Sequence, residues 1–379
     1  MNNVKDWEEF LRTHLSHEQQ QLEGAIGYVK HLISQSLPPI FGEKHFSILT
    51  GVSEIFLRKL ADNSAHYYRT FSIPKRKGGF RNISVPSPTL LHVQRWIVAN
   101  ILRKIPVHEA VHGYVASRSV ITNAKVHREQ ESILRIDIKD FFPTIESQQV
   151  QALFAAIGYR PELSVLMSDL CCRNNVLPQG AATSPAISNW AFAPLDRKLK
   201  ELSQKYSYQY TRYADDIFIS GKHIHDRIES EVAQILLEQK FRINRAKTRF
   251  MGPNRPKILA GVSIASGRLC LPREKKREIK QNAYYIIKYG LFEHCNWKAS
   301  RDPLILEKLL GKINFWLMVE PKNPTALELQ QKLRAISLEF DNSLWEKFEP
   351  KRARDIQDIF KPTPAANFEF PSSMRNSKS

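Results

Sequence analysis

Long hydrophobic runs are missing from this sequence of 379 residues. No stretch approaches the ~18 consecutive apolar residues of a membrane-spanning helix, so we expect neither a membrane span nor a membrane partner. The first nine residues also lack the apolar segment of a secretory signal peptide. Cysteine is scarce, and Cys171, Cys172, Cys270 and Cys295 do not have the spacing of metal ligands. We therefore predict a cytoplasmic protein in which the adjacent Cys171 and Cys172 serve helix packing rather than chemistry.

Acidic residues are outnumbered by basic ones. The chain has 56 Lys and Arg residues against 38 Asp and Glu residues, which gives a formal net charge of +18. An excess of this kind is typical of a protein whose partner is a polyanion. A basic soluble protein without such a partner is the alternative, and the acidic motifs described next favour nucleic acid. At this length the chain can form two or three packed subdomains.

The acidic residues include an adjacent pair, Asp215 and Asp216, within the segment Thr-Arg-Tyr-Ala-Asp-Asp-Ile-Phe-Ile at 211–219. The flanking residues have the side chains of strands, so the pair is predicted to lie at the tight turn of a β-hairpin. Two neighbouring carboxylates repel each other and lose hydration, and the cations that suit oxygen ligands are Mg²⁺ and Mn²⁺. For an isolated Asp-Asp pair, a plain surface turn is the alternative.

A second acidic cluster lies upstream of this pair. The apolar run Ser132–Ile138 contains Asp137 near its end and is followed by Lys-Asp-Phe-Phe-Pro at 139–143. A carboxylate at the end of a buried strand can join a metal site on another strand, so Asp137 is the candidate third ligand. Asp140 could instead cap a helix that begins near 144–146. Three carboxylates suit a pair of divalent ions that activate an oxygen for attack on phosphorus and stabilise leaving pyrophosphate.

With these motifs in this order, the sequence resembles a reverse transcriptase, and within that group the retron and related prokaryotic defence enzymes. The resemblance covers roughly residues 65–330. The matching segments, in chain order, are Ile73–Ile83, Asp137–Pro143, Leu177–Asn189 with its Pro-Gln-Gly turn, Tyr213–Asp216 and Phe241–Thr248. In addition, Asn123-Ala124-Lys-Val-His127 resembles an insertion that sets retron enzymes apart from retroviral ones. The sequence departs from the family at 259–261, where Leu-Ala-Gly replaces the usual Val-Thr-Gly.

The resemblance implies an α+β architecture, the right-hand polymerase fold of fingers, palm and thumb. We place a helical N-terminal extension at 1–64, fingers at 65–131, a palm with the catalytic carboxylates at 132–265, a basic helical thumb at 266–351 and a disordered tail at 352–379. Local patterns agree with this division. They predict a helical run broken by Leu-Pro-Pro at 37–39, a hairpin at 65–86 that turns at Gly78-Gly79, an amphipathic helix at 88–104 and a basic helix at 275–289.

The resemblance also implies an active site. The catalytic metal ligands would be Asp137, Asp215 and Asp216, which would hold two Mg²⁺ ions, with Mn²⁺ able to substitute. Phe142 would lie under the sugar of the incoming nucleotide, where its ring would clash with a 2′-hydroxyl and favour dNTPs. Simple core packing is the alternative for Phe142, although Phe141 is the better core candidate.

The remaining predicted nucleotide contacts are basic side chains that meet the triphosphate and a loop whose backbone comes close to the nucleotide. Lys75 and Arg81, with Arg76 and Lys77, would neutralise the triphosphate. The other predicted nucleotide-binding residues are Gln179, Gly180 and Lys247. Gly180 would let the backbone approach the nucleotide and template. By the resemblance alone, Lys247 would protonate the departing pyrophosphate, and an exposed lysine on the last palm strand is the alternative.

Two further segments are predicted to bind RNA. Asn123 and His127 share one face of a helix, and a structural role is the alternative for both. The segment Arg273–Lys288 has six basic and two acidic residues, with two tyrosines between them. A solvated helix is its alternative reading, but its position after the palm favours contact with RNA phosphates and unpaired bases. The predicted contacts are Lys275, Lys276, Arg277 and Lys280.

The predicted function is that of an RNA-directed DNA polymerase that copies a dedicated structured non-coding RNA into DNA from dNTPs. The retron-like context implies antiphage defence together with an effector or companion protein. One alternative is a defence-associated reverse transcriptase of another class, which makes repetitive or untemplated DNA. Another is a catalytically idle RNA-binding scaffold, which the three intact carboxylates disfavour.

Overall fold

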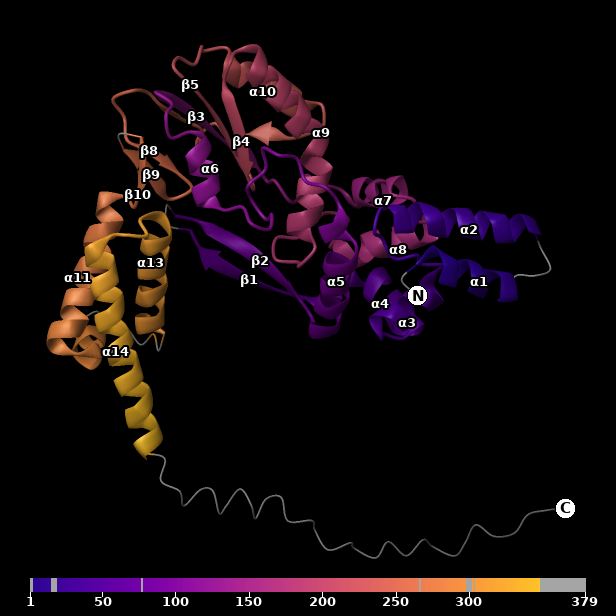
Figure 1. The fold of residues 1–379 in the computed structure, drawn as a ribbon, viewed down its shortest axis with the longest axis horizontal. Helices are drawn as coiled ribbons and strands as arrows, with labels where there is room; N and C mark the ends of the chain where they lie inside the picture. Colours follow the sequence, from indigo (N-terminus) through magenta and orange to yellow (C-terminus); the bar gives the residue numbers. More distant parts are fainter. Residues whose placement is uncertain are drawn as a thin grey trace, which may run out of the picture. The chain divides into compact units, whose positions relative to one another are not determined.

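The computed structural model describes residues 3–14, 19–75, 78–265, 267–297, 302 and 304–347 (Figure 1). The chain divides into two compact units, Met1–Pro272 and Arg273–Ser379. Helices and strands are both present, which confirms the predicted α+β class. No helix in the described ranges combines the length and the apolar character needed to cross a membrane.

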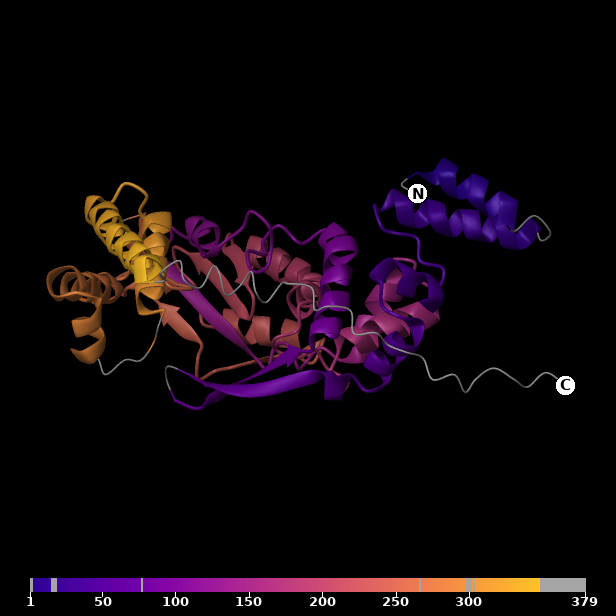
Figure 2. The ribbon, with the colours of Figure 1, turned by 90° about the horizontal axis from the view of Figure 1, so that it is seen from below.

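The first unit begins with helices, as the sequence pattern predicted. Their bounds are α1 Val4–His14, α2 Gln19–Ser34, α3 Glu43–Thr50 and α4 Glu54–Asp62. The Leu-Pro-Pro segment at 37–39 separates α2 from α3, because proline cannot continue the hydrogen-bonding pattern of a helix. Helices α1 and α2 lie side by side (Figure 2), and Trp7 and Leu11 pack against Ala25 and Val29 in a small core of their own.

A two-stranded antiparallel ribbon follows, formed by β1 (Tyr68–Pro74) and β2 (Phe80–Pro86) after the short 3₁₀ helix η1 (Ser64–Tyr67). Gly78 and Gly79 have φ of 90° and 77° in the connecting turn, a conformation that glycine adopts without strain. The predicted hairpin is thus confirmed. The amphipathic segment forms α5 (Pro88–Asn100), with a proline in its first turn, and η2 (Leu102–Lys104).

Within the described part of the chain, five strands form the central sheet in the order β4-β5-β3-β6, with β7 also paired to β3. Their bounds are β3 Ser132–Lys139, β4 Gln209–Tyr213, β5 Asp216–Gly221, β6 Arg242–Ile243 and β7 Arg249–Met251. The helices that accompany this sheet are α6 Val120–Val126, α7 Ser147–Ala156, α8 Pro161–Cys171, α9 Ser184–Lys205 and α10 Ile228–Leu237. Cys171 and Cys172 are buried in the core, in agreement with their predicted packing role.

Alternation along β3 separates the core from the acidic site. Leu134, Ile136 and Ile138 belong to the main hydrophobic core, which also contains buried side chains of α9 and α10. Because successive strand residues point to opposite faces, Arg135 and Asp137 project from the other face. The sheet therefore anchors Asp137 through its apolar neighbours while it keeps the carboxylate out of the apolar core.

A small antiparallel sheet completes the first unit, formed by β8 (Lys257–Leu259), β9 (Val262–Ala265) and β10 (Arg268–Cys270). The segment that departs from the family signature makes the β8–β9 turn, where Ala260 and Gly261 have φ of 46° and 92°. Positive φ at both central residues matches the right-handed twist of the flanking strands.

The second unit is helical. Its helices are α11 Arg273–Tyr289, α12 Leu291–Trp297, α13 Ile305–Val319 and α14 Pro324–Lys347. Ile279, Ile286, Ile313 and Trp316 are buried within it. The predicted basic helix at 275–289 corresponds to α11. The tail predicted at 352–379 lies outside the described residues.

Candidate active site

The three predicted catalytic aspartates meet at one end of the central sheet. In the antiparallel register of β3 and β5, Asp137 lies directly opposite Asp216. Ala214 and Asp215 form the two-residue connection between β4 and β5, and Ala214 has φ of 57°. The Ile138 nitrogen donates a hydrogen bond to the Asp215 carbonyl oxygen at 2.9 Å, which fixes the turn against β3. The predicted hairpin is confirmed, and strand pairing brings Asp137 to it from about 80 residues upstream.

Two basic side chains are paired with these carboxylates. The Lys247 ammonium donates to both oxygens of Asp137, at 2.9 and 3.0 Å. The Arg135 guanidinium donates through Nε and Nη2 to the two oxygens of Asp216, each at 2.9 Å. Arg135 comes from the same strand and the same face as Asp137, two residues earlier. Sequence reasoning missed it, although an arginine within an apolar run two positions before a candidate ligand was an available signal.

Burial and mutual repulsion oppose ionisation of the hairpin carboxylates. Burial raises the pKa of Asp216 to about 6 despite its pairing with Arg135, and the charges of Asp215 and Asp137 add to the shift. Burial also raises the pKa of Asp215, and the charge of Asp137 acts in the same direction. An additional cation among these carboxylates would relieve both effects.

The donor set fits a divalent metal chemically. Three carboxylates carry more negative charge than Lys247 and Arg135 neutralise, and in the described chain no side chain is hydrogen bonded to the Asp215 carboxylate. Hard oxygen donors of this kind are the ligands that Mg²⁺ and Mn²⁺ take. The described residues do not, however, contain a group of three His, Cys, Asp or Glu side chains already arranged around a metal position.

The fully buried Arg212 supports the turn at Ala214 and Asp215 from the protein interior. The Arg212 guanidinium contacts both oxygens of Asp196, at 2.8 and 2.7 Å, and donates at 3.0 Å to the Ala214 carbonyl oxygen. It also donates to Asn189 Oδ1 at 3.1 Å and lies 4.5 Å from the centre of the Phe192 ring. Arg212 therefore ties the hairpin that carries Asp215 and Asp216 to α9. This role was not predicted, and the position of Arg212 within a strand-like run just before Tyr213 was its only signal in the sequence.

The predicted nucleotide-binding loop packs against the β1–β2 ribbon. The Ser84 nitrogen donates to the Gln179 carbonyl oxygen at 2.8 Å. At Gly180, with φ of 125°, a Cβ would lie 2.5 Å from the Ser84 carbonyl oxygen. Glycine is thus required here by the approach of β2 itself, a reason that the sequence did not indicate.

The other predicted nucleotide contacts lie on exposed or half-buried surfaces. Lys75 and Arg81 are exposed at the two ends of the hairpin turn, whereas Arg76 and Lys77 lie outside the described residues. Phe141 is buried in the core, and Phe142 is half-buried at 5.5 Å from it, measured between ring centres. Phe142 therefore has an accessible side, as a contact to a nucleotide would require.

The RNA-binding prediction for Asn123 and His127 is wrong as a direct contact, because both side chains are fully buried. The His127 ring lies between two hydroxyls, with Nδ1 at 2.6 Å from Ser220 Oγ and Nε2 at 2.7 Å from Thr211 Oγ1. Thr211 donates its single proton to Asn123 Oδ1 at 2.7 Å, so it accepts from His127 Nε2. The pair thus fastens α6 to β4 and β5 from inside.

Burial should make His127 a source of acid sensitivity. It lowers the pKa of His127 to about 3, whereas an unfolded chain would titrate near its ordinary value of about 6.5. Between these values the unfolded chain binds the extra proton, so His127 contributes stability that is lost as the pH falls below about 6.5.

For His127→Gln we expect lower stability at pH 7 and a weaker decline between pH 7 and 5 than in the wild type. The difference in slope should be at most about 1.4 kcal/mol per pH unit, measured by urea unfolding. RNA affinity of the folded variant at pH 7.5 should match the wild type. If the folded variant shows the wild-type dependence of unfolding free energy on pH but binds RNA more weakly, His127 contacts RNA directly after all.

The four basic residues predicted to bind RNA on α11 are not equivalent. The Lys276 ammonium pairs with Glu320 on α13 at 2.7 Å and lies 5.5 Å from the Trp316 ring centre. Lys276 therefore has an ionic partner within its own unit and is less available to an RNA phosphate than its exposed neighbours. Arg277 and Lys280 are exposed, and Lys275 is half-buried near the Phe315 ring.

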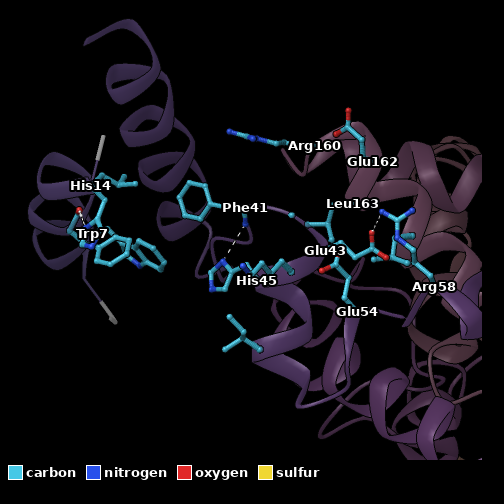
Figure 3. Close-up of a pocket in the computed structure, with 16 residues that line it drawn as sticks. Trp7, His14, Phe41, Glu43, His45, Glu54, Arg58, Arg160, Glu162 and Leu163 are labelled. Atoms are coloured by element: carbon cyan, nitrogen blue, oxygen red, sulfur yellow. Dashed lines mark hydrogen bonds and ion pairs between the residues drawn. The ribbon is translucent and has the colours of Figure 1, made fainter. Parts of the chain in front are cut away.

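The first unit also contains a large, mostly apolar cavity of about 790 Å³ among its N-terminal helices (Figure 3). Its lining includes Trp7 of α1, Phe41 and His45 near the start of α3, Arg58 of α4 and Leu163 of α8. None of the predicted catalytic or nucleotide-binding residues lines it. The candidate active site is therefore the carboxylate cluster and not this cavity.

Comparison with known proteins agrees with this site. Residues 73–280 match the family described as reverse transcriptase (RNA-dependent DNA polymerase). The chain is 33% identical over 273 residues to the retron Mx65 reverse transcriptase of Myxococcus xanthus, which covers 66% of this chain and 64% of that protein. It is 31% identical over 303 residues to the retron Mx162 enzyme of the same organism, covering 71% and 61%. It is 29% identical over 290 residues to the retron Ec86 reverse transcriptase of Escherichia coli, covering 75% and 87%. The match therefore spans less than two thirds of the two Myxococcus proteins.

Proposed function

The chain belongs to the reverse transcriptase family, and on this premise we propose that it is an RNA-directed DNA polymerase of the retron type. The observation that carries the proposal is the convergence of Asp137, Asp215 and Asp216 at one end of the sheet, within a strongly basic chain. Members of this family depend on a divalent metal, and we infer Mg²⁺, with Mn²⁺ able to substitute.

The three aspartates would hold the metal ions. When bound, these ions lower the barrier to attack of a primer hydroxyl on the α-phosphorus of a dNTP and stabilise the leaving pyrophosphate. Lys247 is paired with Asp137 in the structure. Its ammonium group therefore lies beside the carboxylates that would hold the metal ions, where Nζ would donate a proton to the departing pyrophosphate oxygen.

The remaining contacts orient the nucleotide. Arg81 and Lys75, at the exposed turn of the β1–β2 ribbon, would bind the β- and γ-phosphates by charge-assisted hydrogen bonds. Gln179 would contact the nucleotide from the loop that Gly180 joins to β2. Phe142 would close the site on the 2′ side of the sugar.

The direct test of the proposal is DNA synthesis by the purified full-length chain. With a primed RNA template, dNTPs and Mg²⁺, we expect a primer-extension product that disappears when EDTA removes the metal. Failure to extend any primer on RNA under these conditions would reject the polymerase assignment. Synthesis without template dependence would favour the defence-associated class that makes repetitive or untemplated DNA.

The template and the biological setting are part of the same proposal. The chain is similar to retron reverse transcriptases, so we propose a dedicated structured non-coding RNA as template, and a role in cytoplasmic antiphage defence with an effector or companion protein. Sequencing the nucleic acid that co-purifies from the native locus should recover one structured RNA joined to its DNA copy. A population of unrelated transcripts would contradict a dedicated template.

Phe142→Ala should relax sugar selection, because removal of the ring opens space for a 2′-hydroxyl. We expect the ratio of dNTP to rNTP incorporation efficiency to fall by about 10–100-fold on the same template. Phe142→Tyr retains the ring and should retain the ratio. An active Phe142→Ala enzyme with wild-type selectivity would show that this ring only packs the site.

The exposed basic residues of α11 should contribute to RNA affinity rather than to chemistry. For the triple variant Lys275→Ala, Arg277→Ala, Lys280→Ala we expect weaker RNA binding. Each lost phosphate contact should flatten the slope of log affinity against log salt by about 0.7–0.9. The matched control is Lys276→Ala, which removes a paired cation from the same helix and should lower stability while leaving the slope unchanged. If the triple variant and the wild type show the same salt dependence of RNA affinity, α11 is a solvated helix that does not contact RNA.

A further inference from the structure

The segment before α6 is fastened along the catalytic hairpin. Residues 110–112 run parallel to β4, with an isolated bridge between Val111 and Arg212. The His112 nitrogen donates to the Arg212 carbonyl oxygen at 2.7 Å, and the Arg212 nitrogen donates to the Ala110 carbonyl oxygen at 2.8 Å. The strand that leads to the catalytic turn therefore has this segment as its neighbour on one side.

Gly113 brings the segment into contact with the turn itself. A Cβ on Gly113 would overlap the Ala214 backbone nitrogen, so only glycine allows this approach. Asn189 Nδ2 donates to the Gly113 carbonyl oxygen at 2.9 Å. Arg118 Nη1 donates to the carbonyl oxygens of His108 and Val111, at 2.9 and 2.6 Å. The backbone that leads to the next residue, Tyr114, is thus fixed by these contacts.

Tyr114 is held in an unfavourable backbone conformation beside the reacting groups. Its φ is 63°, a region that is strained for an aromatic residue and that persists where surrounding contacts impose it. Tyr114 is 49% exposed as a residue, and its ring lies 6.3 Å from the Phe142 ring, measured between centres. Burial raises the pKa of its phenol, and the nearby Asp215 carboxylate adds to the shift. The phenol therefore stays protonated and uncharged beside the catalytic carboxylates.

The packing around Phe142 explains what Tyr114 can do there. Among the described residues, the aromatic rings that contact Phe142 are the buried Phe141 and the half-exposed Tyr114. Phe141 fixes the ring on its core side. Tyr114 is the contact that comes from outside the Asp137–Pro143 motif, on a backbone fastened to the catalytic turn.

We propose that Tyr114 is a positioning residue for Phe142, which it holds in place so that sugar selection is set by the two rings together. This inference rests on the polymerase function proposed above. A loop residue thereby helps to determine sugar specificity, and Gly113 links sugar selection to the catalytic turn.

The test uses Tyr114→Asn in the full-length chain. Asparagine removes the ring but tolerates positive φ, so the variant should fold, which urea unfolding can confirm. We expect its ratio of dNTP to rNTP incorporation efficiency to fall by about 10-fold, since Phe142 is free to move aside. Tyr114→Phe keeps the ring and should keep the wild-type ratio. The double variant Tyr114→Asn, Phe142→Ala should have the same ratio of dNTP to rNTP incorporation as Phe142→Ala alone, because Tyr114 acts through the Phe142 ring.

Three results would overturn the inference. Equal losses of dNTP and rNTP incorporation in Tyr114→Asn would indicate a structural role only. An unchanged ratio in an active, folded variant would show no role in selection. If the losses of the dNTP to rNTP ratio in the two single variants multiply in the double variant, Tyr114 contacts the sugar independently of Phe142. Failure of the wild type to incorporate dNTPs would instead reject the proposed function, so the two failures are distinguishable.

Discussion

The double variant Asp215→Asn, Asp216→Asn is expected to lose DNA synthesis by at least about 10³-fold while its RNA affinity stays close to that of the wild type. Amides at these positions remove two of the three negative charges that would hold the metal ions. The basic surface is untouched, because the hairpin contributes acids and not cations to the site. Primer extension and equilibrium RNA binding at one fixed salt concentration measure the two effects separately.

Asp140→Asn is the matched control for this loss. Asp140 lies three residues after Asp137, is exposed and has φ of 48°, which asparagine also adopts readily. It should synthesise DNA at nearly the wild-type rate, since it carries the same change of charge outside the carboxylate cluster. Full activity of the Asp215, Asp216 double variant would remove the basis of the polymerase assignment. If Asp140→Asn loses DNA synthesis to a similar extent, activity depends on the total negative charge of this region and not on the three proposed metal ligands.

Asp196→Leu should be the most damaging single substitution away from the carboxylates. Asp196 and Arg212 are both fully buried and paired, so removal of the aspartate leaves a positive charge buried without its partner. Loss of one member of such a pair costs about 3–5 kcal/mol of unfolding free energy, which urea titration can measure. Activity should fall as well, because Arg212 also supports the Ala214 carbonyl oxygen in the catalytic turn.

Two controls separate the buried charge from a general effect of substitution. Glu238→Gln breaks the ion pair with Lys198, whose two side chains are both about half exposed, and should cost no more than about 1 kcal/mol. Adding Arg212→Met to Asp196→Leu should recover a large part of the lost stability, because no lone charge then remains buried. If Asp196→Leu proves as mild as Glu238→Gln, the buried pair does not fix the hairpin.

Much of the catalytic hairpin could be predicted from the sequence because its signals are local. Strand-forming residues on both sides of Asp215 and Asp216 specify a turn, and glycines at 78 and 79 specify another. Asp137 was also predictable, as the acidic end of an apolar run. The meeting of Asp137 with the hairpin followed from the family resemblance, and β-sheet register is its physical cause.

Roles that depend on distant partners could not be read from the sequence. His127 looked like a surface residue at helical spacing from Asn123, but Thr211 and Ser220 enclose it from strands that lie more than 80 residues away. Lys276 looked equivalent to its neighbours until α13 supplied Glu320. The glycine at 180 was explained by a nucleotide contact, which stays a prediction, but the structure adds a second reason in the close approach of Ser84.

The sequence by itself thus determined the family, the secondary structure around the site and the three carboxylates, since each depends on residue type within a few positions along the chain. Only the tertiary structure decided which charges those carboxylates meet and which aromatic rings lie against Phe142. Arg135, Lys247, Arg212 and Tyr114 reach the site through strand pairing, a buried ion pair and a glycine contact. Such contacts join segments far apart in the chain, and their geometry has no signature in any single segment.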